Sequence, residues 1–324
     1  MAFVRFRSLD EKLPLSNLSY KLMKVPSVSV VVTCYNYGHY LAECLDSILQ
    51  QSFSDFEIVI VNDGSVDNTD EIIEKFQNFD NIKYIKQANS GQAKAKNTGI
   101  KNSSGDFIAF LDADDTWEKN KLEKQIPLFS KNMIGVVYSR ARYVDELGQA
   151  LNNIKITEKY LIPKSGNVTN YLFLDNFVPF SSAIVRRECL ERCGVFDESL
   201  QMGVDWDLWL RISTLYSFDF IDEPLLAYRV GHAGQMSKNL EVRQQCSDKI
   251  MSSFIKNYKP LLSNWIIRKA YAFTFRNRGE YYRKIDKTKS CQYFLKSIYQ
   301  NPIEINAYKG LLKTLLLKRK ELIL

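Results

Sequence analysis

The sequence predicts an α/β fold in which a mixed, mostly parallel sheet is flanked by helices and followed by a C-terminal helical extension. Short apolar runs rich in β-branched residues alternate with segments of helical periodicity in the first part of the chain. That alternation is typical of parallel strands joined by right-handed crossovers. Hydrophobic residues make up 45% of the 324 residues, which is ample for a folded core.

Four apolar runs are expected to form the parallel part of the sheet. They are "SVSVVVT" (27–33), "FEIVIV" (56–61), "IKYIK" (82–86) and "DFIAFL" (106–111). Runs of this length and composition are typical of buried strands. Because ligands of such sheets bind beyond the carboxyl ends of the strands, the polar residues that follow these runs are expected to converge on one cleft.

Helices are expected between the strands. After the first strand, apolar residues recur at the spacing of one helix face: Leu41, Cys44, Leu45, Ile48 and Leu49. A second helix is expected to be capped near Asp67, with Asp70 and Glu71 in its first turn. "GQAKAKNTGIK" (91–101) predicts a third helix, whose small residues permit close packing.

From about residue 134 the pattern changes to shorter strands and helices. "IGVVYS" (134–139), "SSAIV" (181–185) and "FDFID" (218–222) predict strands, and "VDELGQAL" (144–151) predicts a hairpin. Residues 241–324 are expected to be mostly helical.

The charge is unevenly divided along the chain. The formal net charge is +7, but residues 241–324 hold 18 Lys and Arg against 6 Asp and Glu, a net +12, which leaves residues 1–240 at −5. We divide the chain into a leader (1–25), an α/β domain (26–240) and a basic helical extension (241–324). A basic extension suits anionic lipid or nucleic acid, and a solvated helical surface gives the same pattern.

The composition also indicates a compartment. No apolar run reaches the roughly 18 residues that span a bilayer, and the N-terminus has no apolar stretch typical of a secretory signal. A cytoplasmic protein is therefore expected. The six cysteines are scattered and lack zinc-site spacing, which favours reduced thiols.

The stretch "FLDADDTW" (110–117) crowds three aspartates after a buried strand. Neighbouring carboxylates raise one another's pKa and destabilise a fold, and a bound cation relieves the repulsion. Asp112 and Asp114 form a D-x-D arrangement that can hold Mg²⁺ or Mn²⁺ together with the phosphates of a substrate. The alternative is a capping cluster in which Asp115 or Thr116 begins the next helix.

Two other interpretations of the acidic segments remain open. "DADDT" (112–116) fits the D-x-D-x-T signature of haloacid-dehalogenase-like phosphatases, in which Asp112 would be the nucleophile. "DGSVDNTDEIIE" (63–74) resembles a calcium loop, but Asn68 stands where the sharp turn of that loop requires glycine.

Further candidates follow the first two strands. Asp63 can accept hydrogen bonds from a ribose or a base, and Gly64 allows close backbone approach; an Asx turn is the alternative. Tyr35 can stack on a base or simply pack. Neither G-x-G-x-x-G nor a P-loop motif is present.

The segment "GVDWDLWLRIS" (203–213) predicts a helix in which Asp207 pairs with Arg211 four residues on. Asp205 is left without a partner near the helix start, as a general base or as an N-cap. His232, one of two histidines, lies in a glycine-containing loop. It can bind a phosphate or a metal, or it can have no functional role.

Taken together, the motifs resemble the family 2 glycosyltransferases, nucleotide-sugar-dependent enzymes of the GT-A fold. The resemblance covers about residues 26–235. It rests on four segments in order: "VSVVVTCYNYGHYLAECLDSILQQSFSDFEIVIVNDGSVDNTDEI", "NSGQAKAKNTGI", "GDFIAFLDADD" and "GVDWDLWLRI".

The resemblance implies a role for each donor-side candidate. Asp63 would contact the base of the donor, with Thr33 and Tyr35 in the same pocket. Asp112 and Asp114 would hold Mg²⁺ or Mn²⁺ against the diphosphate, with Asp114 as the direct ligand.

The resemblance also makes Asp205 the catalytic base, although Val204 stands where the family commonly has Glu. The family's Ala-Arg-Asn appears as Ala95-Lys96-Asn97. Lys96 therefore offers the donor the point charge of an ammonium group instead of the planar guanidinium of arginine. His232 is a further candidate donor contact.

The implied function is an inverting hexosyl- or N-acetylhexosaminyltransferase. It would transfer a sugar from a nucleoside-diphosphate donor, with a UDP-sugar as the expected donor. The acceptor would be a hydroxyl of a saccharide or lipid-linked saccharide in cell-surface polysaccharide or glycoconjugate synthesis. The basic extension would contact the inner face of the plasma membrane, and no nucleic-acid partner is expected. A non-catalytic nucleotide-sugar binder is the further alternative.

Overall fold

The computed structural model describes residues 26–151, 162–232, 234 and 239–316. Within these residues, eight strands form one sheet in the order β3-β2-β1-β4-β7-β6-β8-β5. The strands are β1 (Val28–Cys34), β2 (Phe56–Asn62), β3 (Ile82–Lys86), β4 (Phe107–Asp112), β5 (Thr116–Trp117), β6 (Ile134–Val144), β7 (Ile184–Arg186) and β8 (Ser217–Arg229). The expected mixed α/β fold is confirmed.

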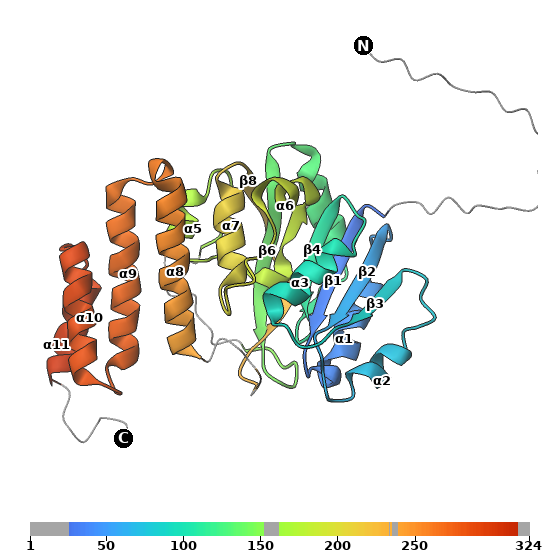
Figure 1. Ribbon diagram of the computed structural model, residues 1–324, viewed down its shortest axis with the longest axis horizontal. Helices are drawn as coiled ribbons and strands as arrows, with labels where there is room; N and C mark the ends of the chain where they lie inside the picture. Colours follow the sequence, from blue (N-terminus) through green and yellow to red (C-terminus); the bar gives the residue numbers. More distant parts are fainter. Residues whose placement is uncertain (1–25, 152–161, 233, 235–238, 317–324) are drawn as a thin grey trace, which may run out of the picture.

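The helices alternate with the strands in the first half of the chain and follow one another in the last part (Figure 1). They are α1 (Gly38–Leu49), α2 (Thr69–Glu74), α3 (Gln92–Lys101), α4 (Lys121–Gln125), α5 (Thr169–Leu174), α6 (Arg187–Cys193), α7 (Val204–Ser213), α8 (Leu240–Tyr258), α9 (Asn264–Tyr282), α10 (Lys287–Gln300) and α11 (Ile305–Leu316).

The four strands β1 to β4 are parallel and correspond to the four predicted apolar runs. Thr33 of β1 lies opposite Val61 of β2 on one side and Asp112 of β4 on the other. The carboxyl ends of the three strands are therefore level, and the polar residues that follow them start from one edge of the sheet.

The second half of the sheet departs from the predicted strand lengths. β6 and β8 run parallel well beyond residues 134–139 and 218–222, because their pairing continues past an irregularity at Ser139 and Arg140. The segment 181–185 is only partly a strand: residues 180–182 form a 3₁₀ turn, and β7 begins at Ile184. The hairpin predicted at 144–151 is present as a bridge between Val144 and Ala150.

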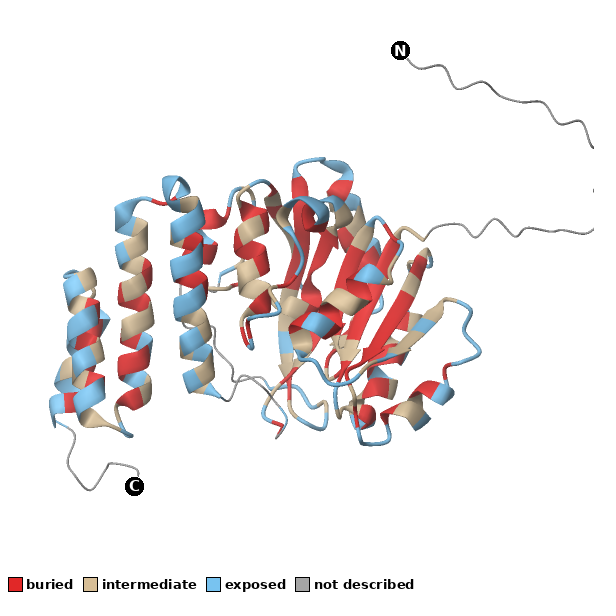
Figure 2. Cartoon of the chain, in the orientation of Figure 1, coloured by how far each residue is buried: buried red, intermediate tan, exposed pale blue. Residues whose placement is uncertain are grey.

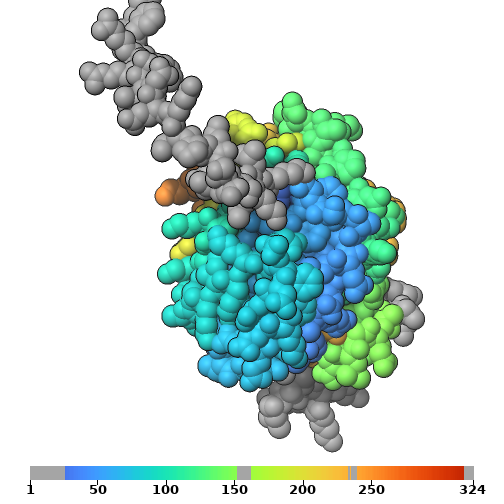
Figure 3. All heavy atoms as spheres, turned by 90° about the vertical axis from the view of Figure 1, so that its right-hand side faces the viewer, coloured from blue at the N-terminus to red at the C-terminus, as the bar shows by residue number. Residues whose placement is uncertain are grey.

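The core lies on both faces of the sheet (Figure 2). Side chains alternate along β1, so that Val30 and Val32 join the core under α1, whereas Val31 joins the core under α3, α5 and α7. Figure 3 views the molecule from the side of β3 and α2, where residues of the first hundred make up most of the surface.

The N-cap of α2, the helix after β2, lies one residue after the expected position at Asp67. Its N-cap position is Asn68, and the Asp67 carboxylate instead accepts hydrogen bonds from the backbone N–H groups of Gly38 (2.9 Å) and Thr69 (3.1 Å). Asp67 therefore ties the start of α1 to the start of α2.

Helices α8 to α11 follow the sheet domain and continue its core. Ile250, Met251 and Phe254 of α8 pack into the same cluster as Trp209 of α7. α9 contacts α5 on one side and α10 on the other. None of the helices in the described ranges is both long and apolar enough to cross a membrane.

The contact between the last three helices is tight because two glycines face one ring. A Cβ added at Gly279 of α9 would lie 2.9 Å from the Phe294 ring of α10, and one at Gly310 of α11 would lie 2.3 Å from it. Each distance is too short for a real Cβ contact, so both positions require glycine for α9 and α11 to pack against Phe294.

Lys121 is a buried lysine in the sheet domain. Its amine lies 4.0 Å from the centre of the Trp117 ring and has no hydrogen-bond partner among the described residues. A desolvated cation–π contact contributes about 2 kcal/mol, which is less than the several kcal/mol that burying an ammonium costs. Burial therefore lowers the pKa of Lys121 well below 10.5.

We predict that Lys121→Met stabilises the protein and changes its pH dependence. Above the lowered pKa of the folded lysine, the unfolded chain binds a proton that the folded chain does not, so wild-type stability rises with pH from that pKa up to about 10.5, by at most about 1.4 kcal/mol per pH unit. Urea unfolding of both proteins at pH 7 and pH 9 measures the difference, and the advantage of the variant should shrink at pH 9. An equal difference at the two pH values would show that the amine stays charged.

Candidate active site

One cleft brings the predicted site residues together. It has a volume of about 1090 Å³ and lies beyond the carboxyl ends of β1, β2 and β4. Seven of the eight candidates line it: Thr33, Tyr35, Asp63, Lys96, Asp112, Asp114 and Asp205. The eighth, His232, contacts Asp114. The cleft also extends to α8 and α9, which the sequence placed in the extension.

Asp112 is held at the end of β4 by Lys96. The Lys96 amine donates to Oδ1 of Asp112 at 2.9 Å, and the Thr33 hydroxyl donates to the same oxygen at 3.3 Å. Lys96 is only 4% exposed and lies over the ring of Phe180 (4.5 Å), whereas the Asp112 side chain is 35% exposed. Lys96 therefore compensates the charge of a carboxylate that still faces the cleft.

Asp114 is oriented by His232. The Nε2 atom of His232 lies 3.0 Å from Oδ2 of Asp114, and both side chains are largely buried. The imidazole packs edge-on against the rings of Tyr37 (5.4 Å) and Tyr40 (5.7 Å). These rings limit the positions that His232 can take, and with it the Asp114 carboxylate.

The third aspartate of the cluster is structural. Asp115 is 1% exposed and accepts hydrogen bonds from the backbone N–H of Arg229 (2.9 Å) and the hydroxyl of Ser181 (2.5 Å). Burial, together with the charges of Asp114 and Asp112, raises its pKa well above 3.8. The interpretation of Asp115 or Thr116 as a helix start is wrong, because Thr116 begins β5 and α4 starts at Lys121.

The side chain of Arg229 is a site component that the sequence did not indicate. Its Nε donates to the carbonyl of Asp114 (2.9 Å), and Nη1 donates to the carbonyls of Asp145 (3.2 Å) and Glu146 (3.1 Å). Nη2 pairs with Glu43 at 2.7 Å. The guanidinium thus joins the D-x-D turn to the 144–151 hairpin and to α1. No local pattern distinguishes this arginine from a solvated one.

The donor set fits a divalent cation that arrives with a substrate. Asp112 and Asp114 supply carboxylate oxygens, which hard cations prefer. Within the described ranges, no group of three His, Cys, Asp or Glu side chains is arranged to hold a metal by itself. Mg²⁺ and Mn²⁺ are commonly bound by one or two carboxylates, with water and phosphate oxygens as the other ligands, so a pair is sufficient.

The buried carboxylate of Asp63 orders the loop before α3. Oδ1 accepts from Gln87 Nε2 (2.7 Å) and the Ser90 N–H (3.0 Å), and Oδ2 accepts from the Gly91 N–H (2.9 Å). Gly64 has φ 79°, and a Cβ there would lie 2.6 Å from the Asn89 nitrogen. The close approach that Gly64 permits is therefore to this loop.

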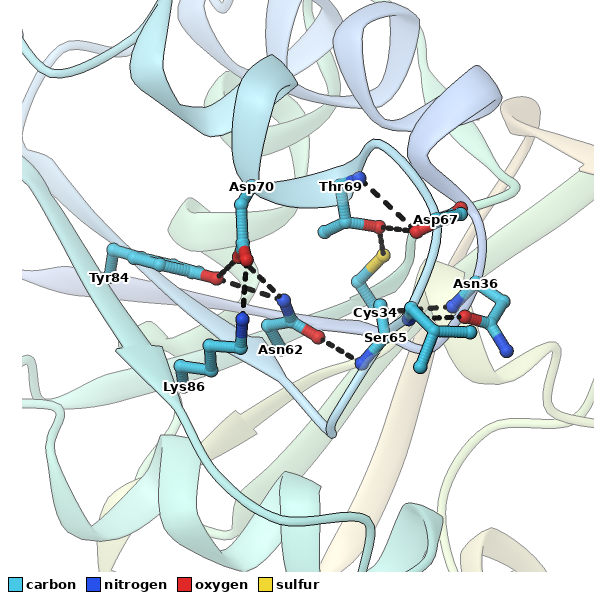
Figure 4. A network of polar contacts seen from close by, with 10 residues as sticks. Cys34, Asn36, Asn62, Ser65, Asp67, Thr69, Asp70, Tyr84 and Lys86 are labelled. Carbon is cyan, nitrogen blue, oxygen red and sulfur yellow. Dashed lines mark hydrogen bonds and ion pairs between the residues drawn. The ribbon is translucent and has the colours of Figure 1, made fainter.

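A hydrogen-bond network fixes the loops after β1 and β2 (Figure 4). Asn36, which has φ 57°, donates its N–H to the Ser65 hydroxyl (2.9 Å) and accepts from the Val66 N–H (2.9 Å). Asn62 accepts from the Ser65 N–H (2.8 Å). Tyr35, between these loops and the cleft, stays 48% exposed and available to a ligand.

The calcium-loop interpretation of residues 63–74 is contradicted by these contacts. The carboxylate of Asp63 is directed to the loop before α3, and that of Asp67 is directed to Gly38 and Thr69. The two carboxylates therefore do not serve one cation.

Asp205 lies in the cleft near the start of α7. The N-cap position is Gly203, in the left-handed region at φ 70°, so the N-cap interpretation of Asp205 is wrong. Its Oδ2 accepts a hydrogen bond from Asn176 Nδ2 (2.7 Å), and burial raises its pKa from 3.8. Asp207 pairs with Arg211 at 2.8 Å, as expected. Asn176, like Arg229, had no recognisable pattern in the sequence.

The chain matches the model of glycosyl transferase family 2 over residues 29–194. An uncharacterised glycosyltransferase of Rickettsia felis is 32% identical over 232 residues, which are 71% of this chain and 38% of the relative. An uncharacterised glycosyltransferase of Methanocaldococcus jannaschii is 32% identical over 258 residues, which are 78% of this chain and 87% of the relative. The matched part is thus well under half the length of the first relative.

Two solved structures are similar in fold. S. aureus TarS 1–349 in complex with UDP-GlcNAc has a TM-score of 0.58 at 19% identity, covering 89% of this chain and 91% of that chain. The mannosyltransferase PcManGT of Pyrobaculum calidifontis, in complex with GDP-Man and Mn²⁺, has a TM-score of 0.58 at 18% identity, covering 91% and 88%. At this identity the likeness concerns the fold, and it confirms the expected GT-A architecture.

We predict that Arg229→Lys lowers the free energy of unfolding by about 2–5 kcal/mol. Lysine keeps the charge but cannot reproduce the planar fork, so buried carbonyls lose their donors at about 1–3 kcal/mol each. Urea denaturation measures the loss. The control is Arg140→Lys, whose ion pair with Asp222 is partly exposed and should matter by less than about 1 kcal/mol. Equal stability of the two variants would contradict a locking role for Arg229.

Proposed function

Since the chain belongs to glycosyl transferase family 2, a family of nucleotide-sugar-dependent enzymes, we propose that it transfers one hexosyl or N-acetylhexosaminyl unit with inversion. The proposed donor is a UDP-sugar, and the proposed acceptor is a hydroxyl of a saccharide or lipid-linked saccharide in cell-surface polysaccharide or glycoconjugate synthesis. The observation that carries the proposal is that Asp205 lines the same cleft as Asp112 and Asp114. Family membership opposes the phosphatase interpretation of Asp112.

The donor is proposed to bind at the edge formed by β1, β2 and β4. The exposed ring of Tyr35 is available to stack on the base, beside Thr33 and Asp63. The choice of UDP is supported by the complexes of TarS with UDP-GlcNAc and with UDP. Asp63 would contact the base from a position that its own loop already fixes.

The diphosphate is proposed to lie at the D-x-D turn. Asp112 and Asp114 would hold Mg²⁺ or Mn²⁺, and the Mn²⁺ in the PcManGT complex supports a divalent ion. When bound, the cation would neutralise the charge that develops on the departing nucleoside diphosphate. Lys96 holds the carboxylate of Asp112, and His232 holds that of Asp114. They would act on the donor through Asp112 and Asp114.

The transfer itself is proposed to be one displacement with Asp205 as the base. The Asp205 carboxylate takes the proton of the acceptor hydroxyl, whose oxygen forms a bond to the anomeric carbon as the bond to the diphosphate breaks. A single displacement inverts the configuration of that carbon. The hydrogen bond from Asn176 fixes one carboxylate oxygen, and burial raises the pKa of Asp205 toward a value suited to a base.

The extension is proposed to bring the enzyme to the inner face of the plasma membrane. On α11 the side chains of Leu312, Leu315 and Leu316 are exposed beside Lys313, which suits an anionic lipid surface. The basic residues Lys318, Arg319 and Lys320 lie outside the described residues, as does the leader (1–25).

The proposed division of the chain is a leader (1–25), a glycosyltransferase domain (26–240) and a basic helical extension (241–324). Single addition is proposed because the Gln-x-x-Arg-Trp motif of processive synthases is absent from the sequence.

We predict that Asp205→Asn lowers the rate of transfer by about 10²- to 10⁴-fold while UDP binding is kept, since the amide cannot accept the proton. UDP release with a UDP-sugar and an acceptor measures the rate, and calorimetry with UDP measures binding. The matched control is Asp207→Asn on the same helix, which should lose stability but keep its rate within a few-fold. A fully active Asp205→Asn protein would remove Asp205 from the mechanism.

We predict that UDP raises the melting temperature in Mn²⁺ and not in EDTA, and that Asp114→Ala abolishes the shift. A ligand at 100 times its Kd adds about 2.7 kcal/mol to the stability, which is readily measured. GDP, dTDP and CDP serve as competing nucleotides. A shift that is independent of metal would contradict the role of Asp112 and Asp114, whereas transfer activity would separate the enzyme from a non-catalytic binder.

A further inference from the structure

We propose that the part of the cleft between α7, α8 and α9 is the acceptor subsite, and that Arg243 there binds a phosphate or carboxylate group of the acceptor. The subsite is lined by Trp206, Arg243, Gln244, Ser247, Asn277 and Tyr281. This inference rests on the proposed function, because it takes the edge at β1 and β4 as the donor site. It gives the acceptor a chemical class.

The lining residues of the two helices follow helical spacing. On α8 they are Leu240, Arg243, Gln244, Cys246, Ser247 and Ile250, and on α9 they are Phe273, Thr274, Asn277, Arg278 and Tyr281. In each set, four residues fall at i, i+3, i+4 and i+7, starting from Leu240 and from Thr274, so one side of each helix faces the cleft. The α9 side is polar except for Phe273, and half of the α8 residues are polar, whereas a helix side that packs against protein is mostly apolar. They are therefore suited to a polar ligand.

Arg243 differs from the other basic residues of the cleft because they have acidic partners and its side chain has none among the described residues. Lys96 pairs with Asp112, Arg140 pairs with Asp222, and Arg278 pairs with Asp248. Within the part of the chain that the structure describes, the side chain of Arg243 makes no hydrogen bond or ion pair, and it is exposed to the cleft. A free guanidinium presents a planar fork of donors that matches phosphate and carboxylate oxygens.

Arg278 links α9 to α8, so its guanidinium is not available to a ligand. Its guanidinium is largely buried, pairs with both carboxylate oxygens of Asp248 (2.7 and 3.0 Å) and donates to the carbonyl of Gln244 (3.1 Å). The contacts link α9 to the turn of α8 that carries Arg243. Arg243 therefore projects from a fixed helix, and its own donors remain available to a ligand.

The subsite adjoins the proposed base. A Cβ at Gly203, two residues before Asp205, would lie 3.0 Å from Ile250 of α8, so the start of α7 touches α8 directly. Arg243 and Ile250 are seven residues apart, or roughly 10 Å along the helix. The acidic residues that line this part of the cleft are Asp175, which directly follows α5, and Asp205 of α7, and neither belongs to α8. An acceptor can thus place a hydroxyl at Asp205 and an anionic group at Arg243.

The test compares Arg243→Gln with Arg140→Gln, both in the presence of saturating UDP and Mg²⁺ so that the donor site is occupied. The probes are glucose, glucose 6-phosphate and glucuronate, titrated by calorimetry. We expect the wild type to bind at least one anionic probe more tightly than glucose. Arg243→Gln should weaken that binding by about ten- to a hundred-fold, as expected for a charge-assisted contact, whereas Arg140→Gln should change it less than two-fold.

Three results would overturn the inference: equal binding of glucose and both anionic probes by the wild type, equal anion binding by Arg243→Gln and the wild type, or loss of UDP binding in Arg243→Gln. The last would place Arg243 in the donor site. A wild type that fails to bind UDP and Mg²⁺ contradicts the proposed function instead, and the anion titrations then still report on Arg243. The phosphate and carboxylate probes show which of the two groups the subsite prefers.

Discussion

The turn after β4 must keep three carboxylates close together, and much of the site is built around that constraint. Asp112 is compensated by an almost fully buried lysine, Asp114 is held by an imidazole, and Asp115 is buried among hydrogen-bond donors. The lysine comes from α3, the imidazole from the segment after β8, and the donors to Asp115 from the end of β8 and from Ser181. The charge repulsion within the turn is therefore managed by groups that only the complete fold brings together.

Arg229 shows how the same turn organises the loops around it. One guanidinium binds the backbone of the D-x-D turn, the 144–151 hairpin and a glutamate of α1, while the backbone N–H of the same residue binds Asp115. His232 follows three residues later and reaches Asp114. The end of β8 and the residues after it thus position Asp114 and the loops beside it, whereas Asp112 is held by Lys96 and Thr33.

Much of the fold was predictable from the sequence, because local patterns determine it. β1 to β4 are compact apolar runs, and α1 has a clear apolar face. β8 was predicted too short, because the apolar pattern ends at Asp222, Glu223 and Pro224; its register with β6 shifts there, from Ile221 opposite Ser139 to Pro224 opposite Arg140. Thr33, Tyr35, Asp63, Asp112 and Asp114 could be predicted because they lie at or just after strand ends, whereas Lys96, inside α3, was indicated by a family motif. Asn176, Arg229 and the cleft sides of α8 and α9 depend on long-range packing that no local pattern records.

The two glycines that face Phe294 have a consequence for evolution of this chain. Gly279 lies on the side of α9 opposite Asn277 and Tyr281, so the ring against which α9 rests sets how far its polar side stands from α7. A methyl group at Gly279 or Gly310 would push a helix outward without altering any cleft residue. Substitution at these remote positions would change the width of the proposed acceptor subsite, and it would leave the edge at β1, β2 and β4 untouched.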